Sequence, residues 1–92
     1  MYHILTENKN LPLVKATLRK YLQGWNIMKG EGCWVNSEGK LLEEDSLLIL
    51  VYHAELDKAI KPACRELCRV NDQERIDILN VKNGQIHHVG KV

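Results

Sequence analysis

The chain has 92 residues, and its 13 Lys and Arg against 12 Asp and Glu leave a formal net charge of +1. This length supports one hydrophobic core and predicts a single domain over residues 1–92. A composition that is 45% hydrophobic and 27% charged excludes an intrinsically disordered chain. The near-neutral charge disfavours nucleic acid or an anionic membrane surface as a partner.

Three features bear on where the protein works. The longest apolar run, residues 47–52, is far shorter than the roughly 20 residues that cross a bilayer. Met1 leads directly into strand-like sequence rather than into a signal peptide. Three cysteines are an odd and small number for a disulfide framework. We therefore expect a cytoplasmic protein with free thiols and no membrane partner.

The chain begins with a predicted strand followed by an amphipathic helix. Residues 2–6 are rich in strand formers and are followed by turn residues. Asn10 is suited to cap a helix over residues 11–22, in which apolar side chains recur at helical spacing. Pro12 is tolerated in the first turn, and Gly24 is suited to end the helix.

A β-hairpin is predicted next. Residues 25–35 are rich in strand formers but are interrupted by Gly30 and Gly32, so we expect an irregular strand with a bulge, a bend or a close backbone approach. The polar residues 36–40 form a loop, and residues 41–53 form a long third strand. These two strands pair with each other.

The second half predicts a helix and a second hairpin. Residues 54–70 carry an apolar stripe with a 3.6-residue period, although Pro62 lies inside it, so we expect one helix with a bend. Residues 75–81 form the fourth strand. The Asn-Gly pair at 83–84 is typical of a hairpin turn and leads to a fifth strand over residues 85–89.

This element order predicts an α+β protein. It is the ferredoxin-like βαββαβ plait with an extra C-terminal hairpin strand, an antiparallel sheet with two helices on one face. The strand over residues 41–53 is apolar on both of its faces, although the helices can cover only one. We therefore expect another subunit to cover the second face. Leu48, Leu50 and Tyr52 lie on one face of this strand, and Leu47, Ile49 and Val51 lie on the other.

The cysteines and histidines do not form a convincing metal site. Cys64 and Cys68 lie one helical turn apart but within the apolar stripe, and no second Cys or His pair accompanies them. This favours buried structural thiols over metal ligands. His87 and His88 alternate between the faces of a strand and cannot chelate one ion together. No spacing predicts a nucleophile with its base.

An acidic cluster, Glu43, Glu44 and Asp45, precedes the apolar part of the third strand. Acidic residues are poor strand formers, so the cluster needs an explanation. It is either a solvated strand entrance that discourages edge pairing, or an anionic subsite for a cationic ligand. Trp34, across the hairpin, would then be an aromatic partner for the same positive charge. Gln73 could add an amide or be a surface turn residue.

These motifs together resemble the phage-encoded S-adenosylmethionine (SAM) lyases. The resemblance covers roughly residues 30–89, with Trp34 at a position where a tyrosine is expected in relatives. More distantly, the pattern is similar to PII-type trimers. The segments that carry it are Gly32-Cys33-Trp34, then Glu43-Glu44 with Ser46, then Asp72-Gln73 before the final hairpin.

The resemblance implies a homotrimer with active sites between subunits and a reaction without cofactor or metal. The substrate's own carboxylate attacks its γ-carbon, expels 5'-methylthioadenosine and leaves homoserine lactone. Glu44 or Glu43 would orient the cationic groups, and only one of them is expected to reach the ligand because the two must point to opposite faces. Glu44 is preferred because its place two residues before Ser46 is the better-matched part of the motif. The implied substrate-binding residues are Trp34, Ser46, Tyr52 and Gln73.

Two other functions remain open at this stage, a PII-like small-ligand sensor and a protein-interaction inhibitor. A sensor of anionic nucleotides should carry basic residues near the hairpin, whereas acidic residues predominate there, which favours a cationic ligand. If the lyase is phage-encoded, it works in the host cytoplasm, where anti-restriction is one conceivable purpose. The acidic residues are Glu31, Glu38, Glu43, Glu44 and Asp45, against Lys29 and Lys40.

Overall fold

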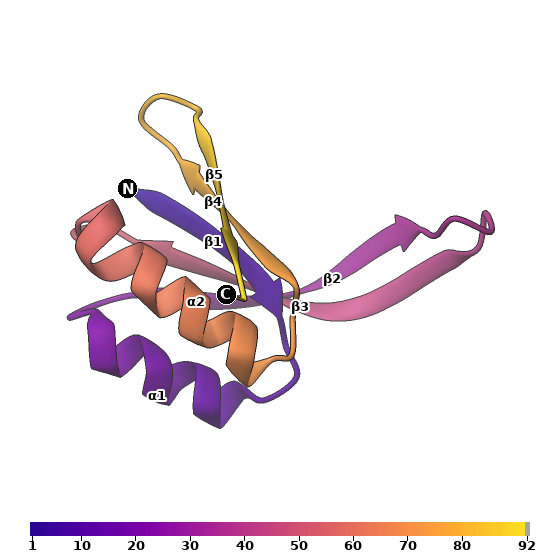
Figure 1. Ribbon diagram of the computed structural model, residues 1–92, viewed down its shortest axis with the longest axis horizontal. Coiled ribbons are helices and arrows are strands. Elements are labelled where there is room, and N and C mark those ends of the chain that lie inside the picture. Colours follow the sequence, from indigo (N-terminus) through magenta and orange to yellow (C-terminus); the bar gives the residue numbers. More distant parts are fainter. Residues whose placement is uncertain (92) are drawn as a thin grey trace.

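The computed structural model describes residues 1–91. Five antiparallel strands form one sheet in the order β2-β3-β1-β4-β5, and both helices lie on one face of it (Figure 1). The predicted ferredoxin-like α+β fold with an added fifth strand is confirmed. The elements are β1 (Tyr2–Glu7), α1 (Leu11–Tyr21), β2 (Asn26–Val35), β3 (Leu41–Val51), the π-helical turn η1 (Leu56–Ile60), α2 (Lys61–Val70), β4 (Arg75–Asn80) and β5 (Ile86–Gly90).

The start of α1 and the turn between β4 and β5 follow the predicted chemistry. The side chain of Asn10 accepts a hydrogen bond from the N–H of Leu13 at 3.3 Å, as an N-cap does. Gly84 has a φ of 73°, which favours glycine, and its N–H donates to the carbonyl of Asn80 at 2.8 Å. Within residues 1–91, no helix is long and apolar enough to cross a membrane.

The predicted single helix with a bend at Pro62 needs correction. The structure has the π-helical turn η1 first, and the regular helix α2 begins only at Lys61. Pro62 therefore lies in the first turn of α2, directly after a π-helical turn that joins α2 without a break. Ile60 has right-handed helical φ and ψ, and the N–H of Lys61 donates to the carbonyl of Leu56.

The predicted bulge in β2 is also wrong. Its ten residues pair one to one with β3, from Asn26 opposite Leu50 to Val35 opposite Leu41, without a bulge. β1 pairs with β3 only as far as Ser46, and the N–H of Asn8 then donates to the carbonyl of Asp45 at 3.0 Å. Within residues 1–91, the remaining part of β3 pairs only with β2. Residues 31–45, here called the hairpin arm, therefore project from the sheet (Figure 1).

Alternation along the strands gives the sheet two different faces. The face under the helices carries the core, including Ile4, Leu47, Ile49, Ile76 and Ile78, none of them more than 1% exposed. We call the opposite side the open face, because helices do not cover it. Its apolar end is a shallow pocket lined by His3, Leu5, Leu48, Asp77, Leu79 and Ile86.

Candidate active site

The polar end of the open face lies where the hairpin arm leaves the sheet. Glu44 of β3 and Trp34 of β2 belong to this face, and they occupy diagonal positions because Gly32 is directly opposite Glu44. A Cβ atom at Gly32 would lie 3.4 Å from Cγ of Glu44. Gly30 is likewise opposite Ser46. The two glycines therefore keep the sheet surface beside Glu44 and Ser46 free of side chains.

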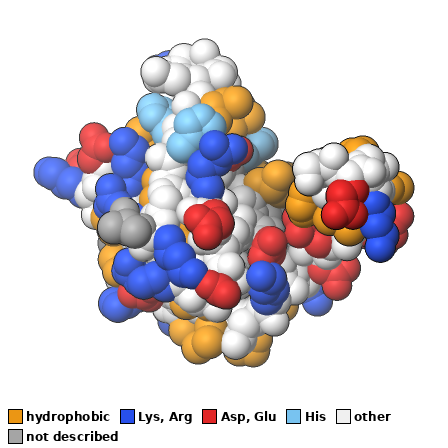
Figure 2. All heavy atoms as spheres, turned by 45° about the vertical axis from the view of Figure 1, so that its right-hand side comes forward, with side chains coloured by type: hydrophobic (Ala, Val, Ile, Leu, Met, Phe, Trp, Pro, Cys, Tyr) orange, Lys and Arg blue, Asp and Glu red, His pale blue; other side chains and the backbone are white. Residues whose placement is uncertain are grey.

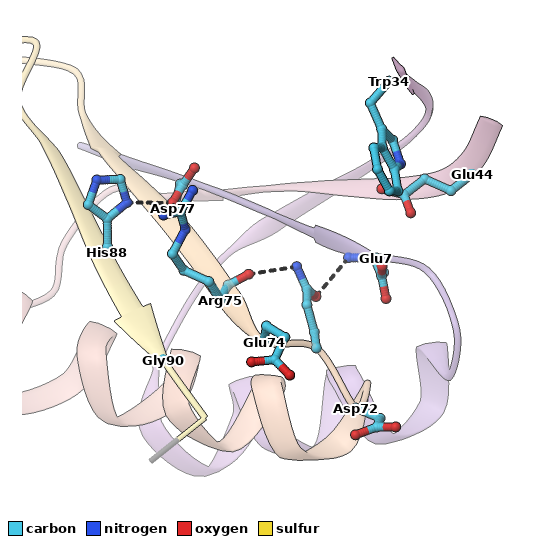
Figure 3. A pocket seen from close by; sticks show the side chains of 10 residues that line it. Glu7, Trp34, Glu44, Asp72, Glu74, Arg75, Asp77, His88 and Gly90 are labelled. Carbon is cyan, nitrogen blue, oxygen red and sulfur yellow. Dashed lines mark hydrogen bonds and ion pairs between the residues drawn. The ribbon is translucent and has the colours of Figure 1, made fainter. Parts of the chain in front are cut away.

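A hollow of about 1070 Å³ opens between the hairpin arm and the start of β4. This is large enough for a small-molecule ligand, since such pockets commonly measure ~300–1,000 Å³. Acidic side chains lie along the gap in Figure 2, and Figure 3 shows Trp34 and Glu44 on one side with Asp77 and His88 on the other. The lining residues are Glu7, Trp34, Glu44, Asp72, Gln73, Glu74, Arg75, Asp77, His88 and Gly90.

The hollow has an excess of negative charge. Five of its lining residues are Asp or Glu, against one Arg and one His. Asp77 is paired with both of the latter, at 2.6 Å from Nδ1 of His88 and 3.3 Å from Nε of Arg75. Lys91 pairs with Asp72. Lys9 pairs with Glu7 at 2.8 Å. The remaining carboxylates, Glu44 and Glu74, favour a cationic ligand.

The environment of Glu44 disfavours its ionised form. Partial burial raises the pKa of its carboxyl group, and the neighbouring Glu7 carboxylate raises it further. Lys9 and the indole of Trp34 act in the opposite direction. Glu44 therefore interacts with groups from both neighbouring strands.

Four of the six predicted site residues come together. Glu44, Trp34 and Gln73 line the hollow, and Ser46 lines an adjoining smaller pocket together with Gln73 and Glu44. The amide of Gln73 already has partners within the chain, since its oxygen accepts from Thr6 Oγ1 at 2.8 Å and its nitrogen donates to the Arg75 carbonyl at 3.0 Å.

The other two predicted residues lie elsewhere in this chain. Glu43 is opposite Cys33 in the sheet. Because successive side chains of a strand point to opposite faces, Glu43 points to the side of the sheet opposite Glu44. Tyr52 follows the far end of β3 and is half exposed, beside a separate recess that also includes Trp25 and His53. Its participation in a site depends on a second subunit and stays a prediction.

Sequence analysis missed Glu7 and the charged residues at the start of β4. Glu7 continues the alternation of His3 and Leu5 along β1, which places it on the open face. That signal was present in the sequence. Its position beside Glu44 was not, because it depends on the register that sets Glu7 opposite Ser46. Among residues 1–91, no three His, Cys, Asp or Glu are grouped to hold a metal ion.

Comparison with known proteins supports the fold. The chain resembles a solved structure of a phage SAM lyase in its apo state, with a TM-score of 0.61 over 97% of this chain and 86% of that one. The sequences are 16% identical, so the likeness establishes a shared fold. Neither a family model nor a curated protein sequence matches the chain. The chain therefore shares its ferredoxin-like fold with this phage lyase.

Proposed function

We propose that the protein is a SAM lyase that cleaves its substrate to 5'-methylthioadenosine and L-homoserine lactone. The observation that carries the proposal is the acidic hollow, in which Trp34 and Glu44 lie side by side on a fold shared with a phage SAM lyase. SAM carries both an ammonium and a sulfonium group. A carboxylate beside an indole suits such a cation, since both attract positive charge.

The reaction requires positioning more than acid–base chemistry. An oxygen of the substrate's carboxylate attacks its γ-carbon, and the bond from that carbon to sulfur breaks. The electron pair stays on sulfur, so the sulfonium becomes a neutral thioether and the carboxylate becomes a lactone. Holding the reactive conformer and removing water from the carboxylate favour this step, because opposite charges disappear in it.

The substrate charges that change during the reaction, and those that do not, indicate the roles of the site residues. The ammonium keeps its charge throughout, so Glu44 can hold it without opposing the reaction. Trp34 packs on the adenine or on the cation. Ser46 and Gln73 line the smaller pocket that adjoins the hollow. Glu43 faces away from the hollow in the isolated chain and is the second candidate for the catalytic carboxylate.

The proposed active form is a homotrimer with sites between subunits. Support comes from the apolar end of the open face, where Leu5 and Ile86 are each 56% exposed. Apolar groups left in water on a small domain favour association. Tyr52 of a neighbouring subunit would complete the substrate-binding set. In an infected cell, this activity would lower the SAM available to methylation-dependent defences in the host cytoplasm.

Incubating the purified protein with SAM and separating the products by chromatography tests the proposal. We expect methylthioadenosine and homoserine lactone. Glu44→Gln keeps the shape and removes the charge, so we expect at least a ~10-fold loss of activity, or about 1.4 kcal/mol of transition-state stabilisation. Glu43→Gln separates the two candidate carboxylates.

The alternatives give different results in the same assay. Binding of SAM without any release of methylthioadenosine would replace the lyase with a small-ligand sensor. Neither binding nor turnover would leave a protein-interaction role. Full activity in both Gln variants would exclude a catalytic part for the acidic pair. Glu55→Gln, an exposed carboxylate before η1, is the matched control for the loss of one charge.

A further inference from the structure

The end of β1 is held by two amide side chains. β4 pairs with β1 only from Tyr2 to Leu5, so Glu7 has no strand partner on that side. Instead, the N–H of Glu7 donates to Oε1 of Gln73 at 3.3 Å, and Nδ2 of Asn71 donates to the carbonyl of Glu7 at 3.0 Å. Figure 3 marks the hydrogen bond that ends on Glu7. Both backbone groups of Glu7 are therefore fixed.

The two amides are themselves fixed by a small buried network. Thr6 Oγ1 donates to Oε1 of Gln73 at 2.8 Å and accepts from Nδ2 of Asn71 at 3.0 Å. Nε2 of Gln73 donates to the carbonyl of Arg75. Thr6 and Asn71 are 2% and 1% exposed. A buried network in which each member bonds to the next holds one arrangement of side chains.

The end of α2 explains why both amides face β1. Asp72 has a φ of 49°, the left-handed conformation that Asp adopts more readily than most residues. The N–H of Gln73 donates to the carbonyl of Cys68 at 2.8 Å, and the N–H of Asp72 donates to that of Arg69 at 3.3 Å. This is a Schellman motif. It turns the chain immediately after Asn71, so that residues 71 and 73 both reach the end of β1.

The side chain of Glu7 lies on the open face, diagonal to Glu44 on the next strand. Its Oε2 is 2.8 Å from the ammonium of Lys9, which also donates to the carbonyl of Asn71. The other charged groups around Glu44 come from the arm and from β4 and β5. They are Glu31, Glu43 and Asp45 on the arm, and Asp72, Glu74, Arg75, Asp77 and His88 across the hollow.

We propose that Gln73 and Asn71 are positioning residues that hold Glu7 against Glu44, and that Glu7 thereby sets the pH range in which Glu44 accepts a cation. The identity of that cation rests on the proposed function. Gln73 then acts through Glu7 rather than by touching the substrate. This accounts for an amide that lines the hollow while both of its ends bond within the chain.

The direction of the pH effect follows from the charges. Glu44 holds a cation only when it is ionised. Burial and then repulsion from the Glu7 carboxylate raise the pKa of Glu44. Cation binding therefore strengthens as the pH rises through that pKa. Removing the charge of Glu7 lowers the pKa of Glu44, so binding should persist to lower pH.

A carbon-13 NMR titration of the Glu44 carboxyl group tests the proposal on the intact protein without substrate. The signal is assigned by its loss in Glu44→Gln. We expect the midpoint to move to lower pH in Glu7→Gln, which keeps the backbone bonds to both amides. Gln73→Met removes the anchor but not the charge, so we expect a smaller shift in the same direction. Glu55→Gln should leave the midpoint unchanged.

An unchanged Glu44 midpoint in Glu7→Gln would overturn the proposal. A shift in Glu7→Gln but none in folded Gln73→Met would remove Gln73 from it. If Gln73→Met does not fold, Asn71→Ser provides the second test of the anchor. Since the titration uses no substrate, failure of the lyase assay is a separate result. In an active enzyme, Glu7→Gln should also move the acid limb of the kcat/KM profile to lower pH.

Discussion

The two faces of the sheet are built from the same strands but have different properties. Ile49 and Leu48 are neighbours on β3, yet Ile49 is fully buried under the helices while Leu48 lies on the open face. The buried part of the covered face is apolar apart from Thr6. The open face changes from apolar at Leu5 and Leu79 to acidic at Glu7 and Glu44. One face stabilises the monomer, and the other is available for a ligand and for other subunits.

The largest effect should follow from a charge on the covered face. Ile49→Asp places a carboxylate among fully buried side chains with no partner, which should cost about 4 kcal/mol or more. A domain of this size has only ~5–14 kcal/mol of stability, so a large part of it would be lost. Circular dichroism during urea unfolding measures the change. An unfolding midpoint equal to that of the unchanged protein would contradict the assignment of this face as the core.

The same change one residue earlier should act on assembly instead. Leu48→Asp puts a carboxylate between Leu5 and Met28 on the open face, where a monomer can still hydrate it. We expect light scattering behind a sizing column to give about three chain masses for the unchanged protein and one for the variant, which stays folded. A stable monomer of the unchanged protein at micromolar concentration would exclude both the trimer and a site between subunits.

These neighbouring positions also show what could be predicted from sequence. Strand alternation is local, so the opposite directions of Glu43 and Glu44, and of Leu48 and Ile49, follow from the order of residues alone. The caps and turns at Asn10 and Gly84 are local as well. The element order was then sufficient to predict the sheet topology.

The composition of the site could not be predicted in the same way. Glu7 reaches Glu44 because of the pairing between β1 and β3, which depends on the whole sheet. Gly30 and Gly32 predict a bulge by their weak strand propensity, but in the structure they pair regularly. Their lack of a side chain matters instead for the surface beside Glu44. The register, rather than any motif, decides which residues meet.

The smallest expected effect is a difference in thiol reactivity between the buried core and the exposed hairpin arm. Cys64 and Cys68 are buried in the core, and Cys33 is exposed on the hairpin arm. Burial raises the pKa of Cys64 to about 12, so at pH 8 only ~0.01% of it is the reactive thiolate, and burial raises the pKa of Cys68 as well. Raising the pH from 7 to 9 still leaves Cys64 protonated, because both values lie far below that pKa.

We therefore expect the native protein to take up one equivalent of a small uncharged maleimide, and the protein in denaturant to take up three, as measured by intact mass. Cys33→Ser should abolish labelling of the native protein. Two or three labels on the native protein would mean that the helices do not protect the covered face. Slower labelling of Cys33 at high protein concentration than at low concentration would show that assembly also covers the hairpin arm. In that case the arm belongs to the subunit interface as well as to the ligand site, and variants on it should be assayed for assembly before activity.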